Sequence, residues 1–155
     1  MYEIEPQDVE DLIRAFMTAL EENNKEEFEP YLADDFRFSG WTPRPLNRAG
    51  FLDLIEGLKA GIPGLIFNLH NVLAPDDTTA TGTWKIAGYQ SDSFVLPVLG
   101  LPPIPQMAAS ISMPTEDVEY KLANNKIVGI AVAHTLNGGI KGLLHQLGVD
   151  IPLVS

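Results

Sequence analysis

The amino-acid sequence predicts an α+β fold in which helices pack on one face of a curved, mainly antiparallel sheet. Two features of the chain predict it. Within residues 6–61, apolar side chains recur at helical spacing in three separate segments. After residue 64, apolar strand-like segments alternate with short polar turns. Helices followed by a series of strands are typical of an α+β protein with an antiparallel sheet.

Three helices are predicted before the main strands. The first begins at Pro6, which suits a first helical turn, and ends at Asn23. A short second helix follows around Phe28. The third begins at Asn47, a good N-cap, and ends at the glycine- and proline-containing run 61–64.

The remaining elements are strands and one closing helix. A short strand, 36–41, is expected between the second and third helices. Pro114 predicts a bulge or bend in its strand, and a sheet that curls in this way encloses a cone with the long helix. The longer predicted strands are 65–74, 79–90, 107–122 and 126–135, and the closing helix is 140–149.

Length and charge limit the organisation and the partners. The 155 residues are expected to form a single domain, 1–155. Residues 1–35 contain twelve acids and two bases, so they hold most of the net charge of −11. This distribution argues against a nucleic-acid or membrane partner, because both need basic patches. The acidic segment is either a solvated helix face or an acidic docking surface.

The residue types present also limit the chemistry. The chain has no cysteine, no apolar run of the roughly 18 residues that a membrane span needs, and an N-terminus unlike a signal peptide. We therefore expect a cytoplasmic protein. His70, His134 and His145 lie far apart, and the common nucleotide, hydrolase and metalloprotease motifs are missing from the sequence. We expect neither a metal nor a cofactor.

Several segments resemble the SnoaL-like polyketide cyclases of the NTF2-like superfamily, which are cone-shaped α+β proteins. The resemblance covers nearly the whole chain, and LGLPP and GLLHQLGV are its most specific parts. It implies a small apolar ligand bound in the cone, but the superfamily includes cyclases, isomerases, hydrolases, dehydratases and non-catalytic binders, so it does not decide the activity. In order, the similar segments are FEPYLADDFRFSGW, NRAGFLDLIEGLKAGIPGLIFNLHNVL, TATGTWKIAGYQSDSF, LGLPP, NKIVGIAVAH and GLLHQLGV.

An apolar loop, VLPVLGLPPIPQMAA at 95–109, holds four prolines and no charged residue. Loops usually lie in water, so an apolar loop is expected to cover something. The resemblance places LGLPP near the mouth of the cone. We predict that residues 95–106 cover the ligand pocket, form part of a dimer interface, or do both.

The cyclases that the chain resembles use a histidine before this loop and an aspartate after it as an acid/base pair. Local alignment places the histidine at Gln90 and the aspartate at Val118, so neither titratable group is present. Glu116 shares the inward parity of Val118, and Asp117 shares it only if a bulge shifts the register. The predicted catalytic carboxylate is therefore Glu116 or Asp117, unless Glu116 is a solvated strand end. If Glu116 is buried, its pKa is expected to be raised.

The predicted ligand pocket has aromatic, aliphatic and polar walls. A plain core role is the alternative for Phe38 and Trp84, and an outward direction is favoured for His70. Ala131 belongs to a set of small residues that leaves a roomy cavity if it faces the cone. The predicted lining residues are Phe38, Trp41, His70, Trp84, Gln90, Leu99, Leu101, Tyr120 and Ala131.

The same assignment of faces puts Ile130 and Val132 on the outer face of the sheet. An apolar outer face needs a cover, and a second copy of the chain is the simplest one. We therefore predict a homodimer through the sheet.

Two functions are compatible with these patterns. The first is a cyclase-, isomerase- or hydrolase-like acid/base enzyme that uses a pocket carboxylate. The second is a non-catalytic ligand-binding or dimerisation module with a degenerate active site. A buried carboxylate that is hydrogen-bonded to a polar partner in the cone favours the first, and a dry cavity without titratable groups favours the second.

Overall fold

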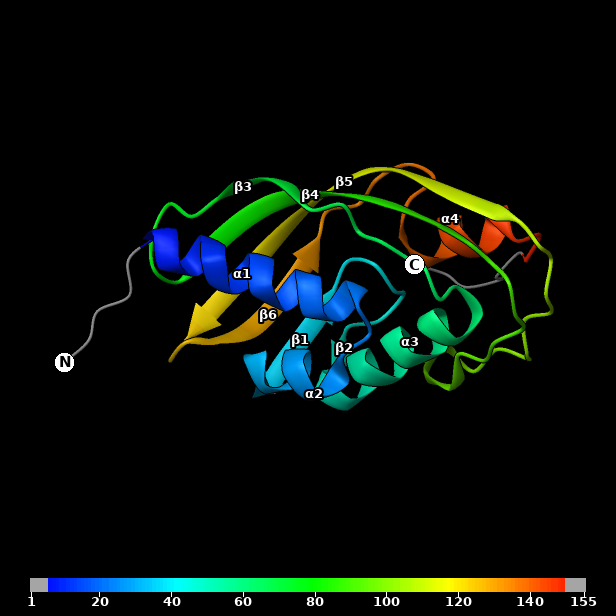
Figure 1. The fold of residues 1–155 in the computed structure, drawn as a ribbon, viewed down its shortest axis with the longest axis horizontal. Helices are drawn as coiled ribbons and strands as arrows, with labels where there is room; N and C mark the ends of the chain where they lie inside the picture. The colour runs from blue at the N-terminus through cyan, green and yellow to red at the C-terminus, as the bar shows by residue number, and fades with distance from the viewer. Residues whose placement is uncertain (1–5, 150–155) are drawn as a thin grey trace.

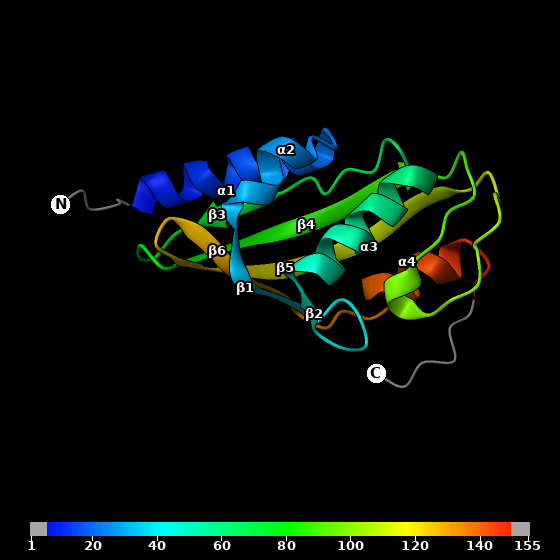
Figure 2. The same cartoon turned by 90° about the horizontal axis from the view of Figure 1, so that it is seen from below.

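The computed structural model describes residues 6–149, which form four α-helices, two short 3₁₀ segments and a six-stranded sheet. Figures 1 and 2 show long strands that arch over α1 and α3, with α4 near the opposite end of the sheet from the start of α1. The elements in order are α1 (Pro6–Glu21), α2 (Lys25–Phe28), η1 (Glu29–Tyr31), β1 (Leu32–Ser39), β2 (Leu46–Asn47), α3 (Arg48–Gly61), β3 (His70–Leu73), β4 (Thr79–Tyr89), η2 (Pro97–Leu99), β5 (Ser110–Ala123), β6 (Lys126–Val132) and α4 (Gly139–Gln146).

The sheet has the order β2-β1-β6-β5-β4-β3. All neighbouring strands are antiparallel except β1 and β6, which are parallel. The predicted antiparallel meander of the last four strands is confirmed, and the parallel pairing turns it into a mixed sheet. No helix in the part of the chain that the structure describes is both long and apolar enough to cross a membrane.

Local signals position the helices and turns as predicted. Asn47 caps α3, since its side chain accepts a hydrogen bond from the Gly50 amide at 2.8 Å. Asn23 follows α1 with a φ of 58°, and Asn124 and Asn125 have φ values of 53° and 63° in the turn between β5 and β6. Such a pair of positive φ values is typical of a tight hairpin turn.

Pro114 lies at the predicted bulge. Lys85 pairs with Thr115 and Ala87 with Ser112, so β5 contains one more residue than β4 at this point. After the bulge, Glu116 and Val118 face the core while Asp117 faces out. The inward parity predicted for Glu116 is confirmed.

The expected strand 65–74 is wrong over most of its length, because only β3 and an isolated bridge between Ile66 and Ala87 form. Asn68 and Asn71 have φ values of 50° and 56°, which break the extended conformation. The strands expected at 107–122 and 126–135 are confirmed as β5, which begins at Ser110 and ends at Ala123, and β6, which ends at Val132.

The faces expected for β6 are wrong. Ile130 and Val132 are 1% and 4% exposed in the core, whereas Ala131 and Ala133 are exposed on the outer face. Burying the larger side chains removes more apolar area from water. The outer face of the sheet therefore has no large apolar residues from this part of β6, and this reason for a homodimer is lost. The homodimer itself stays a prediction.

The proline-rich loop packs against α3. Phe94, Leu96 and Ile104 are buried in the core, and the Phe94 and Ile104 backbones exchange hydrogen bonds of 3.0 and 2.8 Å. On α3, a Cβ added at Gly61 would collide with the Phe94 ring, and one at Gly57 would lie 2.5 Å from the Val95 carbonyl oxygen. The loop thus covers the small-residue face of this helix.

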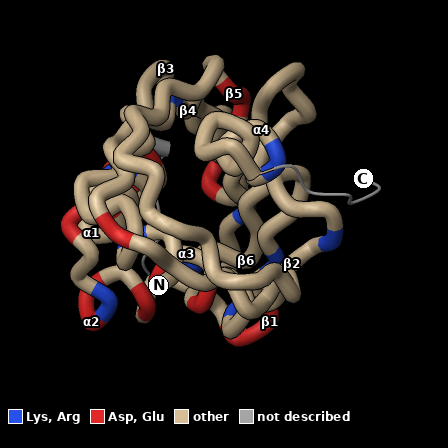
Figure 3. The backbone as a smooth tube through the Cα atoms, turned by 90° about the vertical axis from the view of Figure 1, so that its right-hand side faces the viewer, with Lys and Arg blue, Asp and Glu red and all other residues tan. Residues whose placement is uncertain are grey.

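The charges are distributed as the sequence indicates. Figure 3 shows acidic residues over α1, α2 and β1, and a basic residue on α4. The helix α4 contains Lys141 and no acidic residue.

Candidate functional site

Glu116 is the most unusual polar residue of the core. It is 1% exposed and lies on β5 opposite Trp84. One carboxylate oxygen, Oε2, accepts hydrogen bonds from Trp41 Nε1 at 3.1 Å and from the Gly139 amide at 3.0 Å. The other oxygen, Oε1, is buried without a hydrogen-bond partner among the described residues. Buried polar atoms are normally paired, so an unpaired one needs an explanation.

Two loops bring the donors to Glu116. Trp41 follows β1 after Gly40, whose φ of 88° and close approach to the Val132 carbonyl leave no room for a side chain. Gly139 begins α4 with a φ of 70°. The Ile140 amide donates to the Trp41 carbonyl at 2.9 Å, which joins the two loops over the carboxylate.

The surroundings raise the pKa of Glu116 above its usual value. Removal of the carboxylate from water is the main cause, and it opposes ionisation. The hydrogen bonds from the Gly139 amide and the Trp41 indole stabilise the charged form and offset part of this effect. A carboxyl group whose pKa is moved toward neutrality exchanges protons efficiently there. Such groups are common in functional sites.

Glu116 borders a pocket of about 100 Å³ between the loop after β1, the end of β6 and the start of α4. A larger hollow of about 820 Å³ lies beside this pocket over α4. His134, Gly138 and Lys141 are among the residues that line both, so the two spaces meet along this rim. We call the pocket and the hollow together the α4 site.

Trp41 is the one predicted ligand residue that lines the pocket with Glu116. The residues that line this pocket do not include any from the loop 95–106, beneath which the ligand was expected. A separate hollow of about 450 Å³ lies between that loop and the exposed side of α3, where Asp53, Val95 and Pro103 contribute to its walls.

The other predicted aromatic residues fill the interior. Trp84 Nε1 donates to the Tyr120 hydroxyl at 2.9 Å, and both side chains are buried. Phe38 stacks on Trp84 with ring centroids 6.4 Å apart. The packing role considered for Phe38 and Trp84 is the one observed, and contact with a ligand stays a prediction.

Gln90 holds the proline-rich loop. Its side chain is fully buried, at 0% exposure, and its Nε2 donates to the carbonyls of Pro105 at 2.8 Å and Asp92 at 3.1 Å. Its Oε1 accepts from the Met107 amide at 2.8 Å. Within that loop, Leu99 and Leu101 are partly buried against the core. Gln90, which stands where the resemblance places a histidine, thus has its side-chain oxygen and nitrogen hydrogen-bonded to the backbone.

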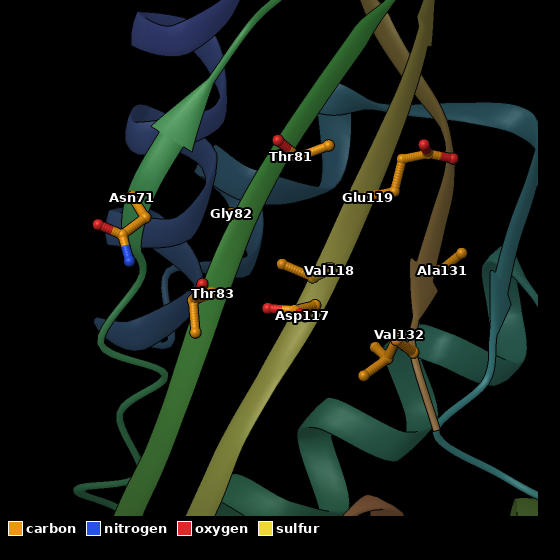
Figure 4. A pocket seen from close by; sticks show the side chains of 10 residues that line it. Asn71, Thr81, Gly82, Thr83, Asp117, Val118, Glu119, Ala131 and Val132 are labelled. Atoms are coloured by element: carbon orange, nitrogen blue, oxygen red, sulfur yellow. The ribbon is translucent and has the colours of Figure 1, made fainter. Parts of the chain in front are cut away.

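The remaining predicted residues lie on the outer face. Figure 4 views this face, with Asp117 and Ala131 beside a hollow of about 530 Å³ and the helices behind the strands. His70 is exposed, pairs with Thr83 across β3 and β4, and contacts the Asn68 carbonyl through Nδ1 at 2.8 Å. The expectation that Ala131 faces the cone is wrong for the reason given for β6, and the outward direction of His70 is confirmed.

Sequence reasoning missed two parts of the site. The backbone amide of Gly139 and the side chain of Lys141 come from the segment NGGIK, which shows only that a helix starts there. The contact between Trp41 and Glu116 joins residues 75 positions apart, and no local pattern indicates it. Within residues 6–149, no three His, Cys, Asp or Glu residues are grouped so that they could hold a metal ion.

Solved structures with the same fold support the topology. AclR, a proposed hydroxylase from Streptomyces galilaeus, is 15% identical with a TM-score of 0.71, covering 92% of this chain and 96% of that one. An LEH-like epoxide hydrolase from Mycobacterium tuberculosis is 13% identical with a TM-score of 0.66, covering 92% and 94%. A SnoaL-like polyketide cyclase from Agrobacterium tumefaciens is 19% identical with a TM-score of 0.59, covering 81% and 89%.

At these identities the similarity shows the fold alone. Among curated proteins, none matches the chain significantly. The profile of the SnoaL-like domain matches residues 13–130, which is most of the chain and includes α3 and the whole sheet up to Ile130. The chain therefore belongs to the SnoaL-like domain family.

Proposed function

We propose that this SnoaL-like domain is an acid/base enzyme that acts on a small organic molecule, with Glu116 as the residue that transfers the proton. The observation that carries the proposal is the buried, unpaired Oε1 of a carboxyl group that borders a pocket. The names of two neighbours of the same fold, a polyketide cyclase and an epoxide hydrolase, support chemistry on small organic molecules. The reaction is cyclase-, isomerase- or hydrolase-like.

The arrangement assigns different tasks to the two carboxylate oxygens. Trp41 and Gly139 hold Oε2, so the carboxylate cannot rotate freely. Oε1 is then free to accept a proton from a C–H or O–H group of the substrate, which keeps the electron pair. The carboxyl group becomes neutral in this step, which burial favours. It can return the proton to a different substrate atom, which completes an isomerisation or a ring closure.

The alternative is a ligand-binding or dimerisation module with a degenerate active site. Its support is that Gln90 and Val118 occupy the positions of the family's acid/base pair, and that Gln90 is bound to the loop. In this case Glu116 only stabilises the junction between Trp41 and α4.

The pKa of Glu116 is the first test of the enzyme, because an ordinary value would remove the reason for an acid/base role, whereas catalysis decides between the two functions. We would follow the side-chain carboxyl carbons by ¹³C NMR as the pH changes and assign Glu116 with Glu116→Gln. Glu119→Gln is the matched control, because Glu119 lies on the same strand but on the outer face. We expect the resonance lost in Glu116→Gln to titrate above the ordinary glutamate pKa of about 4.3.

Catalysis is tested with slow carbon acids. Exchange of the α-hydrogens of cyclohexanone, acetophenone and the carboxylate 4-acetylbenzoate in D₂O is followed by ¹H NMR with wild type, Glu116→Gln and Glu119→Gln. Acceleration by wild type and Glu119→Gln, but not by Glu116→Gln, supports the enzyme. Asp117→Asn tests the other predicted carboxylate in the same assay. An ordinary Glu116 pKa, or equal exchange with wild type and Glu116→Gln, refutes the proposal.

A further inference from the structure

The rim of the α4 site carries a lysine, although the chain is strongly acidic. Lys141 and His134 line both the pocket and the hollow, and His145 lines the hollow. Of the described residues that line either space, Glu116 is the one that is acidic. In Figure 3 the tube of α4 carries blue, and the red of α1, α2 and β1 lies elsewhere. Against a net charge of −11, this rim has one lysine and, among the described residues, no carboxylate other than Glu116.

The backbone at the start of α4 is already used. The Gly139 amide donates to Glu116, the Ile140 amide to the Trp41 carbonyl, and the Gly138 amide to the Thr135 carbonyl at 2.8 Å. These amides are therefore not available to an outside anion. Among the groups at the rim, the Lys141 ammonium is the permanent positive charge, with three donor hydrogens.

Lys141 and Glu116 are placed so that one bound molecule could contact both of them, one at each end. Glu116 borders the smaller, more enclosed space, whereas Lys141 lines that space and the larger hollow. A substrate with its reacting carbon over Glu116 Oε1 extends past Lys141 as it leaves the pocket. We propose that the substrate is a small organic carboxylate whose anionic group is bound by Lys141 at the junction of the pocket and the hollow.

This inference rests on the proposed function and names its substrate class. The two charges have separate effects on binding. The positive charge of Lys141 attracts the carboxylate, and ionised Glu116 repels it. Binding is therefore expected to be weakened by the loss of Lys141 and not by the loss of the charge of Glu116.

The test uses benzoate and hexanoate as probes, with benzamide and hexanamide as neutral counterparts of the same size. Each is titrated into ¹⁵N-labelled protein, and amide shifts at residues 134–146 are followed by NMR. The variants are Lys141→Gln, Glu116→Gln and, as the matched control, Lys126→Gln. Lys126 is an exposed lysine at the start of β6, at the opposite end of β5 from α4.

We expect the carboxylates to shift amides around Gly139 and Lys141, and to bind more tightly than the amides. Lys141→Gln is expected to weaken carboxylate binding about tenfold, the effect of losing one charged hydrogen bond. Lys126→Gln is expected to bind as wild type does, and Glu116→Gln as tightly or more tightly. No shift around α4, equal binding of acids and amides, or unchanged affinity in Lys141→Gln overturns the inference.

The two proposals fail in different ways. If Glu116 has an ordinary pKa while carboxylates bind through Lys141, the acid/base role is refuted and the α4 site is an anion-binding site. If the pKa of Glu116 is raised and carbon acids exchange, but carboxylate binding does not depend on Lys141, the acid/base role is supported and the substrate is neutral.

Discussion

The predicted effect of Gln90→Leu follows directly from the contacts of this side chain. Leucine has nearly the volume of glutamine, so the core stays filled. The change removes three hydrogen bonds of the side chain, two to the proline-rich loop at Pro105 and Met107 and one to Asp92 just before it. Each is worth about 1 kcal/mol net in a folded protein.

The expected cost is therefore about 2–3 kcal/mol of unfolding free energy, since the backbone partners are only part-buried and water satisfies some of them. For a chain of this size, that loss lowers the melting temperature by about 4–12 °C. The bridge between Phe94 and Ile104 should also open more often, because Gln90 ties both sides of the loop together.

Urea denaturation measures the free energy of unfolding, and amide hydrogen exchange measures how often the proline-rich loop opens. The matched control is Gln106→Leu, which removes one exposed hydrogen bond to the Ser91 carbonyl in the same loop. It is expected to change stability by less than about 0.5 kcal/mol. The Phe94 and Ile104 amides should exchange faster in Gln90→Leu than in Gln106→Leu.

A stability for Gln90→Leu within about 0.5 kcal/mol of wild type, with unchanged exchange of these amides, would refute the reasoning. Gln90 would then be free for another role, and the family's catalytic position would again be a candidate. The expected result instead assigns this position to the closure of the loop.

Three further predictions concern Glu116 and the loop, and a fourth the homodimer. Relative to Glu116→Gln, wild type should lose stability as the pH rises from 4.5 through the raised pKa of Glu116, because the unfolded chain releases this proton first. The loss is up to about 1.4 kcal/mol of unfolding free energy per pH unit. Wild type that gains stability over Glu116→Gln in this pH range contradicts the prediction. Trp41→Phe should raise the pKa of Glu116 further in a ¹³C titration, since one donor to the carboxylate is lost, and a lower value would show that the indole does not stabilise the charge. Gly61→Ala should lower the unfolding free energy by about 1–3 kcal/mol in urea denaturation, because the added methyl group meets the Phe94 ring. Gly64→Ala is the control and should leave stability unchanged, because a Cβ there has nothing within 4 Å. Equal effects of the two substitutions would show that the loop is not closely packed on α3. Native mass spectrometry is expected to give a dimer with a small organic adduct, and a bare monomer would contradict both the homodimer and the bound ligand.

Sequence alone determined the features that depend on neighbouring residues. Asn47 predicted the start of α3, and the Asn124-Asn125 pair predicted the turn between β5 and β6. Pro114 predicted the bulge, and the alternation after it placed Glu116 inward. These signals are readable because capping, turn formation and strand alternation are decided within a few residues.

Only the tertiary structure decided what each face meets. Alternation shows that Ile130 and Ala131 lie on opposite faces of β6, but the core's need for apolar area decided which one is inside. Likewise, the sequence placed Glu116 in the interior without its partners. Trp41 and Gly139 reach it because the loop after β1 and the start of α4 meet over the end of β6. Contacts between such distant segments depend on how the whole chain packs, which no local pattern records.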